Sequence, residues 1–298
     1  MALGILTLNA GNLRGDLAAY SVKDHGSVFP QQLLWSHVDP QPSQAFLTLS
    51  SHLSRGLKYC GIPWDQVGGM AVSTGPGSFT GMRIGLAYCY GLARGQGSPL
   101  FAGLSSLQCA GTWLALQSGV AVTLVLPSTR THGFWMAAEA DGTLSQEATL
   151  VDLTRDDDPF RLSLRKTLQR GPGAGTLVYL GGPEHQPFQD RFLRLAALPE
   201  PIEIPSALCK EAATSESSSP PVPPRGLWSQ ASGLPPGGLV FLQPEILAES
   251  SLLGMAHAVV RDGPALFHGE RPSPRFLRLS TAEEVRLKSP SLAREDSL

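Results

Sequence analysis

A buried strand, a glycine-rich turn and an unusually apolar helix follow one another in this chain, and their order constrains the fold more than any other feature. Gly69 to Ser73 is a short apolar run typical of a buried strand. The turn Gly75-Pro76-Gly77-Ser78 comes next, and the apolar pattern then predicts a helix from Phe79 to Arg94. A strand that turns directly into a helix indicates a sheet with helices packed on it.

The turn itself has the residues of an anion site. Glycines allow backbone conformations that other residues avoid, and Ser78 or Thr80 can cap the first amides of the helix, where anions often bind. We therefore interpret the turn as phosphate-loop-like, with Gly75, Gly77, Ser78 and Thr80 as its candidate residues. It matches neither a Walker loop nor the Gly-x-Gly-x-x-Gly dinucleotide pattern. The alternative is that the glycines only let a strand reverse into a helix.

The helix that follows is apolar on every side, with Arg83 as its only charge before Arg94. Such a helix must be covered all round, and its own sheet can cover one side. Either the helix over 43–60 covers the rest within the chain, or the two helices together form a docking face for another protein. Gly81 and Gly85 would then form a flat strip for a partner helix, and a Gly85→Arg variant would fold but fail to pair. For the docking face, the candidate residues are Phe46, Leu49, Leu53, Gly81, Arg83, Ile84, Gly85, Tyr88 and Leu92.

The remaining pattern predicts an α/β protein with a mixed sheet. Three short strands form a meander, a helix follows, and strands and helices then alternate. The meander strands are Leu3 to Leu8, Asp16 to Lys23 and Val28 to Val38, and the helix is Ser43 to Cys60. Later elements are a strand at Pro99 to Ala102, a helix at Ser105 to Gln117, a strand at Val120 to Leu126, and a hairpin of Phe134 to Ala140 with Thr143 to Val151 around Asp141-Gly142. This order is typical of the ribonuclease-H-like arrangement of actin and sugar kinases.

The second half has weaker signals and no visible internal repeat. We expect helices around Pro159 to Gln169, Pro187 to Ala197 and Ser250 to Val260, with a strand at Thr176 to Leu180. Residues 214–238 are dense in Ser, Pro and Gly, so we interpret them as a mobile insertion, and 288–298 as a frayed tail. The resulting division is an N-terminal lobe over 1–110 with the interface helices, and a C-terminal lobe over 111–287.

Composition narrows the function classes. The formal net charge is −2 without a long basic run, which disfavours tight direct binding of a phosphate backbone. Charged residues make up only 16%, against about 25% in soluble domains, which weakly favours a buried partner interface. The four cysteines have no pairing or metal-ligand spacing. With no secretory signal and no apolar stretch of about 20 residues, we expect a soluble cytoplasmic protein that does not enter a membrane.

The run Gly75 to Gly85, Gly-Pro-Gly-Ser-Phe-Thr-Gly-Met-Arg-Ile-Gly, resembles the hallmark of the TsaB family of bacterial threonylcarbamoyladenosine synthesis. Gly91-Leu92-Ala93 and Leu104-Ser105-Ser106-Leu107 continue the resemblance. It is looser at Leu126 to Arg130 with Phe134-Trp135-Met136, and faint at Pro274 to Arg278. About the first 140 residues carry it.

The resemblance implies a two-lobed actin-like (ASKHA) fold and a subunit that performs no bond chemistry. It implies pairing with the catalytic subunit TsaD through the helices after the first sheet, work with the ATPase TsaE, and contact with tRNA only through the complex. ATP would be used by the assembly, with no cofactor assigned to this chain, and a homodimer is a further possibility. Three features depart from the family: Leu8-Asn9-Ala10-Gly11 replaces Asp-Thr-Ser, Pro42-Ser43-Gln44 replaces a His-Ser/Thr pair, and the chain is longer through its Pro-Ser insertion.

Catalytic alternatives find little support in the residues. The seven histidines form no His-x-x-x-His pair and none has metal-ligand spacing. Ser78 lies in Gly-Ser-Phe-Thr-Gly, which is not the Gly-x-Ser-x-Gly of hydrolases. Asp156-Asp157-Asp158 is more typical of a solvated turn or a helix cap than of a metal site. We assign no catalytic or metal-binding residue, and the alternative function is an independent actin-fold phosphotransferase or hydrolase acting on a small molecule.

Overall fold

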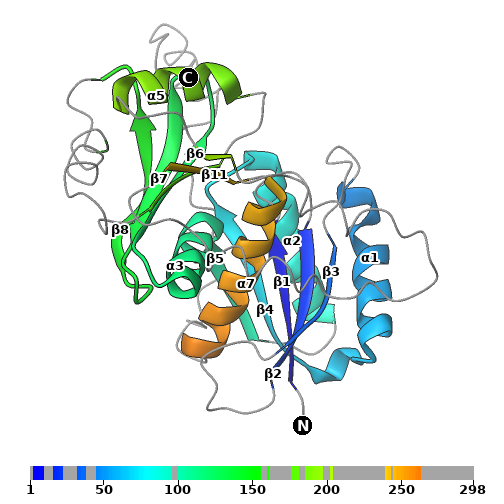
Figure 1. Ribbon diagram of the computed structural model, residues 1–298. Helices are drawn as coiled ribbons and strands as arrows, with labels where there is room; N and C mark the ends of the chain where they lie inside the picture. Colours follow the sequence, from blue (N-terminus) through cyan, green and yellow to red (C-terminus); the bar gives the residue numbers. More distant parts are fainter. Residues whose placement is uncertain are drawn as a thin grey trace, which may run out of the picture.

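A computed structural model describes the fold of the chain. The described residues are 3–9, 16–22, 32–37, 45–95, 100–155, 160, 176–180, 185–196, 202–203, 239–242 and 244–262. Within them two β-sheets form separate layers, with helices between and outside them (Figure 1).

The first sheet has five strands in the order β3-β2-β1-β4-β5. Its strands are β1 (Leu3–Asn9), β2 (Asp16–Val22), β3 (Gln32–His37), β4 (Val67–Gly75) and β5 (Leu100–Ser105). β1, β2 and β3 pair antiparallel, and β4 and β5 continue parallel to β1. The expected meander and the buried strand before the glycine-rich turn therefore lie in one mixed sheet.

Two helices cover one face of this sheet. They are α1 (Ala45–Cys60) and α2 (Phe79–Gly95), and a short 3-10 turn η1 (Trp64–Gln66) leads into β4. Leu49 and Leu53 of α1 and Leu86 and Cys89 of α2 pack in one cluster with Val72 and other β-strand residues. Burial of these side chains supplies most of the driving force that holds the helices to the sheet.

The opposite face is covered by α7 (Pro244–Asp262), which contacts β1, β2 and β4. α3 (Ser106–Ser118) packs along α7 and contacts the second sheet with its other side. Ala71 of β4 lies in the cluster with Trp113 of α3 and Met255 of α7, whereas its neighbours Met70 and Val72 face α1 and α2. A late segment of the chain thus completes the core of the first lobe.

The second sheet has six strands in the order β10-β11-β9-β6-β7-β8. Its strands are β6 (Val122–Pro127), β7 (His132–Ala138), β8 (Leu144–Asp152), β9 (Thr176–Leu180), β10 (Ile202–Glu203) and β11 (Leu239–Leu242). β6, β7 and β8 are antiparallel, and β9 and β11 run parallel to β6. The topology of the first sheet is therefore repeated, although the sequence shows no repeat.

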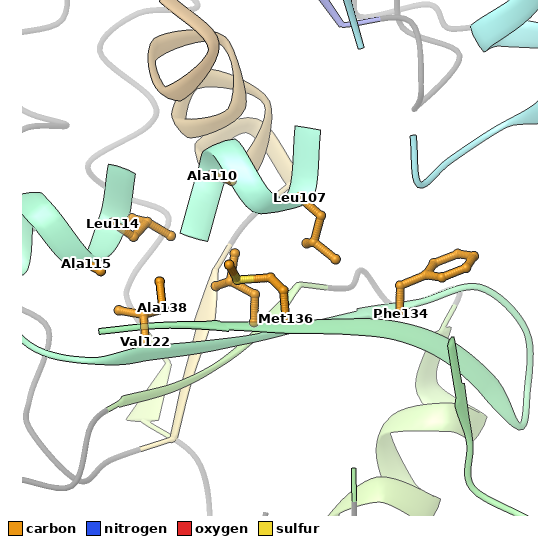
Figure 2. Packing of buried hydrophobic residues seen from close by; sticks show 9 residues of the cluster. Leu107, Ala110, Leu114, Ala115, Val122, Phe134, Met136 and Ala138 are labelled. Atoms are coloured by element: carbon orange, nitrogen blue, oxygen red, sulfur yellow. The ribbon is translucent and has the colours of Figure 1, made fainter. Parts of the chain in front are cut away.

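The alternation of side chains along β7 divides the second lobe into two cores. Phe134 and Met136 point to α3 and pack with Leu107 and Leu114 (Figure 2). Trp135 points to the other face, in a cluster with Phe160 and with the aromatic side chains of α5 (Gln186–Ala196). α3 and α5 therefore lie on opposite faces of this sheet.

This architecture confirms the predicted fold class. Two mixed sheets with the ribonuclease-H-like strand order, each with helices packed on it, form the two-lobed actin-like (ASKHA) arrangement. The predicted lobe boundary at 110/111 falls within α3, which contacts both lobes. Several segments discussed from the sequence lie outside the described residues. They are most of the helix expected at 159–169, the insertion at 214–238, the tail at 288–298, Asp156–Asp158 and Pro274–Arg278.

Candidate functional site

The glycine-rich turn connects β4 to α2 beside the start of α3. Gly75 has φ of +129°, a conformation that favours glycine, and the Gly75-Pro76 peptide bond is cis. The hydroxyl of Ser106, at the first residue of α3, donates to the carbonyl oxygen of Gly75 over 3.4 Å. The turn is thereby tied to the helix that joins the two lobes.

Ser78 is the residue that caps α2. Its Oγ accepts a hydrogen bond from the backbone amide of Gly81 over 3.1 Å, as an N-cap serine does. Thr80, the other candidate cap, is exposed in the first turn of the helix, and Gly77 is exposed in the loop. The Ser78 oxygen thus already accepts a hydrogen bond from one of the helix amides that a phosphate would use. Binding of a phosphate at this turn stays a prediction.

α2 has a buried side and an exposed side. Gly81, Met82, Gly85, Leu86 and Cys89 are buried within the chain. The expectation that Gly81 and Gly85 form an outward strip is therefore wrong, because these glycines face the interior of the lobe. A Gly85→Arg variant would place a charged side chain in that interior, so it would report on folding rather than on pairing.

The exposed side of α2 follows heptad-like spacing. Thr80, Ile84, Ala87, Gly91 and Arg94 recur at alternating steps of four and three residues, and all are exposed. Ile84 keeps 38% of its surface accessible. No atom lies within 4 Å of a Cβ built on Gly91, so the middle of this row is open. We call these five residues the α2 outer row.

α1 lies beside α2 and covers part of it. The hydroxyls of Ser50 and Tyr88 form a hydrogen bond of 3.2 Å between the two helices. Leu49 and Leu53 point inwards and are 2% and 5% exposed, so these candidate interface residues belong to the core. Leu47, which sequence reasoning did not single out, is 85% exposed on the outer side of α1.

The other candidate interface residues divide between surface and partial burial. Arg83 is exposed, and its guanidinium lies 3.9 Å from the centroid of the Phe79 ring, a cation–π contact along the helix surface. Tyr88 and Leu92 are half-buried between α2 and its neighbours. The side chain of Phe46 lies outside the described residues. The exposed residues of the two helices include Leu47, Arg83 and the α2 outer row, and these form the candidate docking surface.

A polar network lies at the open end of the β7–β8 hairpin, opposite its turn at Asp141-Gly142, and sequence spacing did not indicate it. His132 Nδ1 lies 2.9 Å from the Thr131 hydroxyl, and Nε2 lies 3.6 Å from a carboxylate oxygen of Asp152. Partial burial raises the pKa of Asp152, but hydrogen bonds from Thr154 and the charges of His132 and Arg155 outweigh it and lower the pKa. These contacts hold the two strand ends together.

The two buried cysteines, Cys89 and Cys109, lack the lowered pKa that a nucleophilic thiol needs. Burial raises the pKa of the Cys109 thiol to about 12 and that of Cys89 further. A thiol kept protonated in this way is a poor nucleophile. Within the described part of the chain, no three His, Cys, Asp or Glu side chains come together as metal ligands.

Among the helices that the structure describes, none combines the length and apolar character needed to cross a membrane.

One family model matches a segment of the chain that contains this site. The family model described as TsaD, tRNA N6-adenosine threonylcarbamoyltransferase, matches residues 47–150. That segment includes nearly all of α1, the glycine-rich turn, α2 and α3. The comparison with curated proteins found no match to the chain.

Two solved structures from Pseudomonas aeruginosa resemble the chain in fold. A crystal structure from Pseudomonas aeruginosa, of an uncharacterized protein with similarity to peptidase YEAZ, is 16% identical with a TM-score of 0.55; the match covers 93% of this chain and 100% of that one. YeaZ from Pseudomonas aeruginosa is 18% identical over 59% of this chain and 75% of its own, with a TM-score of 0.44. At these identities the likeness is one of fold, and the first structure carries it.

The matched segment contains the run Gly75 to Gly85, on which the resemblance to the TsaB family, that of YeaZ, is based. The fold around it is shared with the Pseudomonas aeruginosa protein over nearly the whole chain. Residues 47–150 are therefore similar to the TsaD family, and they lie in a chain that shares the fold of the Pseudomonas aeruginosa protein.

Proposed function

We propose that this chain is the non-catalytic partner subunit of an assembly that makes threonylcarbamoyladenosine in tRNA. It would bind a TsaD-like catalytic subunit through the outer side of α1 and α2, and hold that subunit in a competent shape. A TsaE-like ATPase would join the assembly and consume ATP, and tRNA would be contacted only through the complex.

The observation that carries the proposal is the α2 outer row. An exposed helix face on which an isoleucine is followed by alanine and glycine at heptad spacing suits close packing of a second helix. Leu47 adds an almost fully exposed leucine on the neighbouring helix. Exposed apolar groups that gather on one face favour a protein partner, and the family match begins at Leu47 itself and contains the whole row.

Two features support a role without bond chemistry. Asn9 ends β1 where most relatives carry the aspartate of a phosphate loop, so the carboxylate that would help to hold a metal-bound nucleotide is missing. Ser78, whose hydroxyl belongs to the turn itself, is engaged as a helix cap. Both features favour a chain that supports a catalytic relative.

The direct test is co-expression of this chain with the TsaD-like protein of the same cells, followed by purification and nucleoside analysis of tRNA. We expect a stable complex, no nucleotide turnover by the isolated chain, and a loss of threonylcarbamoyladenosine from tRNA when the chain is depleted. Nucleotide turnover by the isolated chain that persists through extensive purification, together with unchanged tRNA, would favour the phosphotransferase or hydrolase alternative.

A further inference from the structure

A second candidate site lies between β3 and α1, away from the helix face proposed for the partner. It is a cavity of about 610 Å³, within the range of small-molecule sites. Its described lining residues are Trp35, His37, His52, Arg55, Lys58 and Tyr59. His52, Arg55 and Tyr59 recur at steps of three and four, so they share one flank of α1, whereas Ser50 faces α2.

One wall of the cavity is a series of parallel rings. Trp35 lies flat on α1 at Gly56, where an added Cβ would meet indole carbons at 2.5 Å. The Trp35 and His37 rings are within 7° of parallel with centroids 6.2 Å apart. The His37 and His52 rings follow at 3.7 Å and 18°. β3 and α1 thus hold three flat side chains in one orientation.

The rim of the cavity is basic. Arg55 and Lys58 are exposed, and Tyr59 is 46% exposed beside them. None of the described lining residues is acidic, so the local charge is positive although the chain as a whole carries −2. Arginine presents a planar fork of donors that matches the oxygens of a phosphate.

These walls select among ligand classes. Stacked imidazoles hold their nitrogen lone pairs in parallel planes, so His37 and His52 cannot converge on one metal ion. Flat aromatic surfaces instead suit the π-face of a nucleobase, and two nearby cations suit its phosphate. A polynucleotide would need a longer basic track than a chain of net charge −2 offers, which favours a single nucleotide.

We propose that the cavity between β3 and α1 binds a purine mononucleotide, with its base against Tyr59 and the ring series and its phosphate against Arg55 and Lys58. The proposal does not depend on the partner-subunit function, because the residues that carry it lie on the flank of α1 turned away from α2. Variants of the cavity therefore separate the two proposals.

The test is calorimetric titration of the full chain with adenosine monophosphate, with adenosine, and with a six-residue oligoadenylate RNA. We expect adenosine monophosphate to bind, and adenosine to bind at least about tenfold more weakly, since one charge-assisted hydrogen bond contributes roughly this factor. Arg55→Ala and Tyr59→Ala should each weaken binding of the monophosphate by about tenfold or more. The control Arg130→Ala removes an exposed arginine in the second lobe, outside both proposed sites, and should leave binding unchanged.

Thermal melting followed by circular dichroism checks that each variant is folded. The proposal is overturned if folded wild-type chain does not bind adenosine monophosphate, or binds it equally well in Arg55→Ala and Tyr59→Ala. If the oligoadenylate binds tightly and the monophosphate does not, the cavity contacts a nucleic-acid chain and the single-nucleotide proposal is wrong. Pairing with the TsaD-like protein should be the same for Arg55→Ala and wild type.

Discussion

The crossing of α3 and α7 gives the sharpest prediction about stability. At Gly254 the two helices approach so closely that an added Cβ would lie 2.1 Å from the carbonyl oxygen of Cys109 and 2.5 Å from its carbonyl carbon. Both atoms belong to the backbone of α3, so no change of side-chain rotamer can relieve the contact. Gly254→Ala must push the helices apart.

The expected loss of stability follows from two opposing terms. Overpacking of a core costs about 1–3 kcal/mol, and a backbone clash that only helix movement relieves belongs at the upper end of that range. Alanine gains about 1 kcal/mol over glycine in helix propensity. We therefore expect Gly254→Ala to lower the free energy of unfolding by about 2 kcal/mol.

Urea denaturation followed by far-ultraviolet circular dichroism measures this difference. The matched control is Gly91→Ala on α2, where no atom lies within 4 Å of the added Cβ, so the free energy of unfolding should rise by about 0.5–1 kcal/mol. If Gly254→Ala is as stable as wild type while Gly91→Ala behaves as expected, α3 and α7 do not cross this closely and the described interior between the lobes is wrong.

Three further changes probe other parts of the account. Burial, with a smaller contribution from the charge of Arg261, lowers the pKa of His257 from 6.5 to about 4. Between these two pH values the unfolded chain binds a proton at this histidine and the folded chain does not. The free energy of unfolding should therefore fall by up to about 3 kcal/mol from pH 6.5 to 4. Denaturation of His257→Leu should lack this fall, and an equal fall in that variant would assign it to other groups. With the two other cysteines replaced by serine, Cys89 and Cys109 should react with a thiol reagent at pH 8 only after denaturation, and rapid reaction of the native chain would show that they are accessible. Ser78→Ala should cost about 1 kcal/mol in urea denaturation through loss of the α2 cap, with Ser78→Asp close to wild type; an unchanged midpoint for Ser78→Ala would mean that the cap contributes nothing.

The elements of the fold could be read from local patterns because their signals are short-range. Helix α1 and strand β9 lie where apolar periodicity predicted them, and the hairpin forms around Asp141-Gly142. α7 was expected to begin at Ser250 but begins at Pro244. Short strands such as β10 carry too few residues for a pattern and were missed.

Long-range arrangement was harder to predict. The apolar character of α2 can be recognised in the sequence, but the side that the sheet and α1 cover cannot. Gly81 and Gly85 were therefore expected on the surface of the lobe, whereas they are buried within it. Equally, nothing local indicated that α7 returns to the first sheet, or that the strand order of one lobe is repeated in the other. Both depend on contacts between residues that are far apart in the chain.

The cavity between β3 and α1 also could not be predicted from the sequence. Trp35 and His37 come from a strand, and His52, Arg55 and Tyr59 from the next helix, so their common site exists only once α1 docks on the sheet. Gly56 leaves the space that the Trp35 indole occupies on α1. In the sequence alone it looks like an ordinary glycine within a helix. Sites assembled from two elements in this way need the structure.

Light scattering after gel filtration with the purified TsaD-like subunit tests most directly the proposed binding of a second actin-fold protein to the α2 outer row. Wild type and the control Arg55→Ala should form a complex with the mass of one copy of each protein. Ala87→Arg, a change on the exposed side that leaves the core untouched, should remain folded and elute separately from the subunit. A full complex with folded Ala87→Arg, or none with wild type, would contradict the proposed binding.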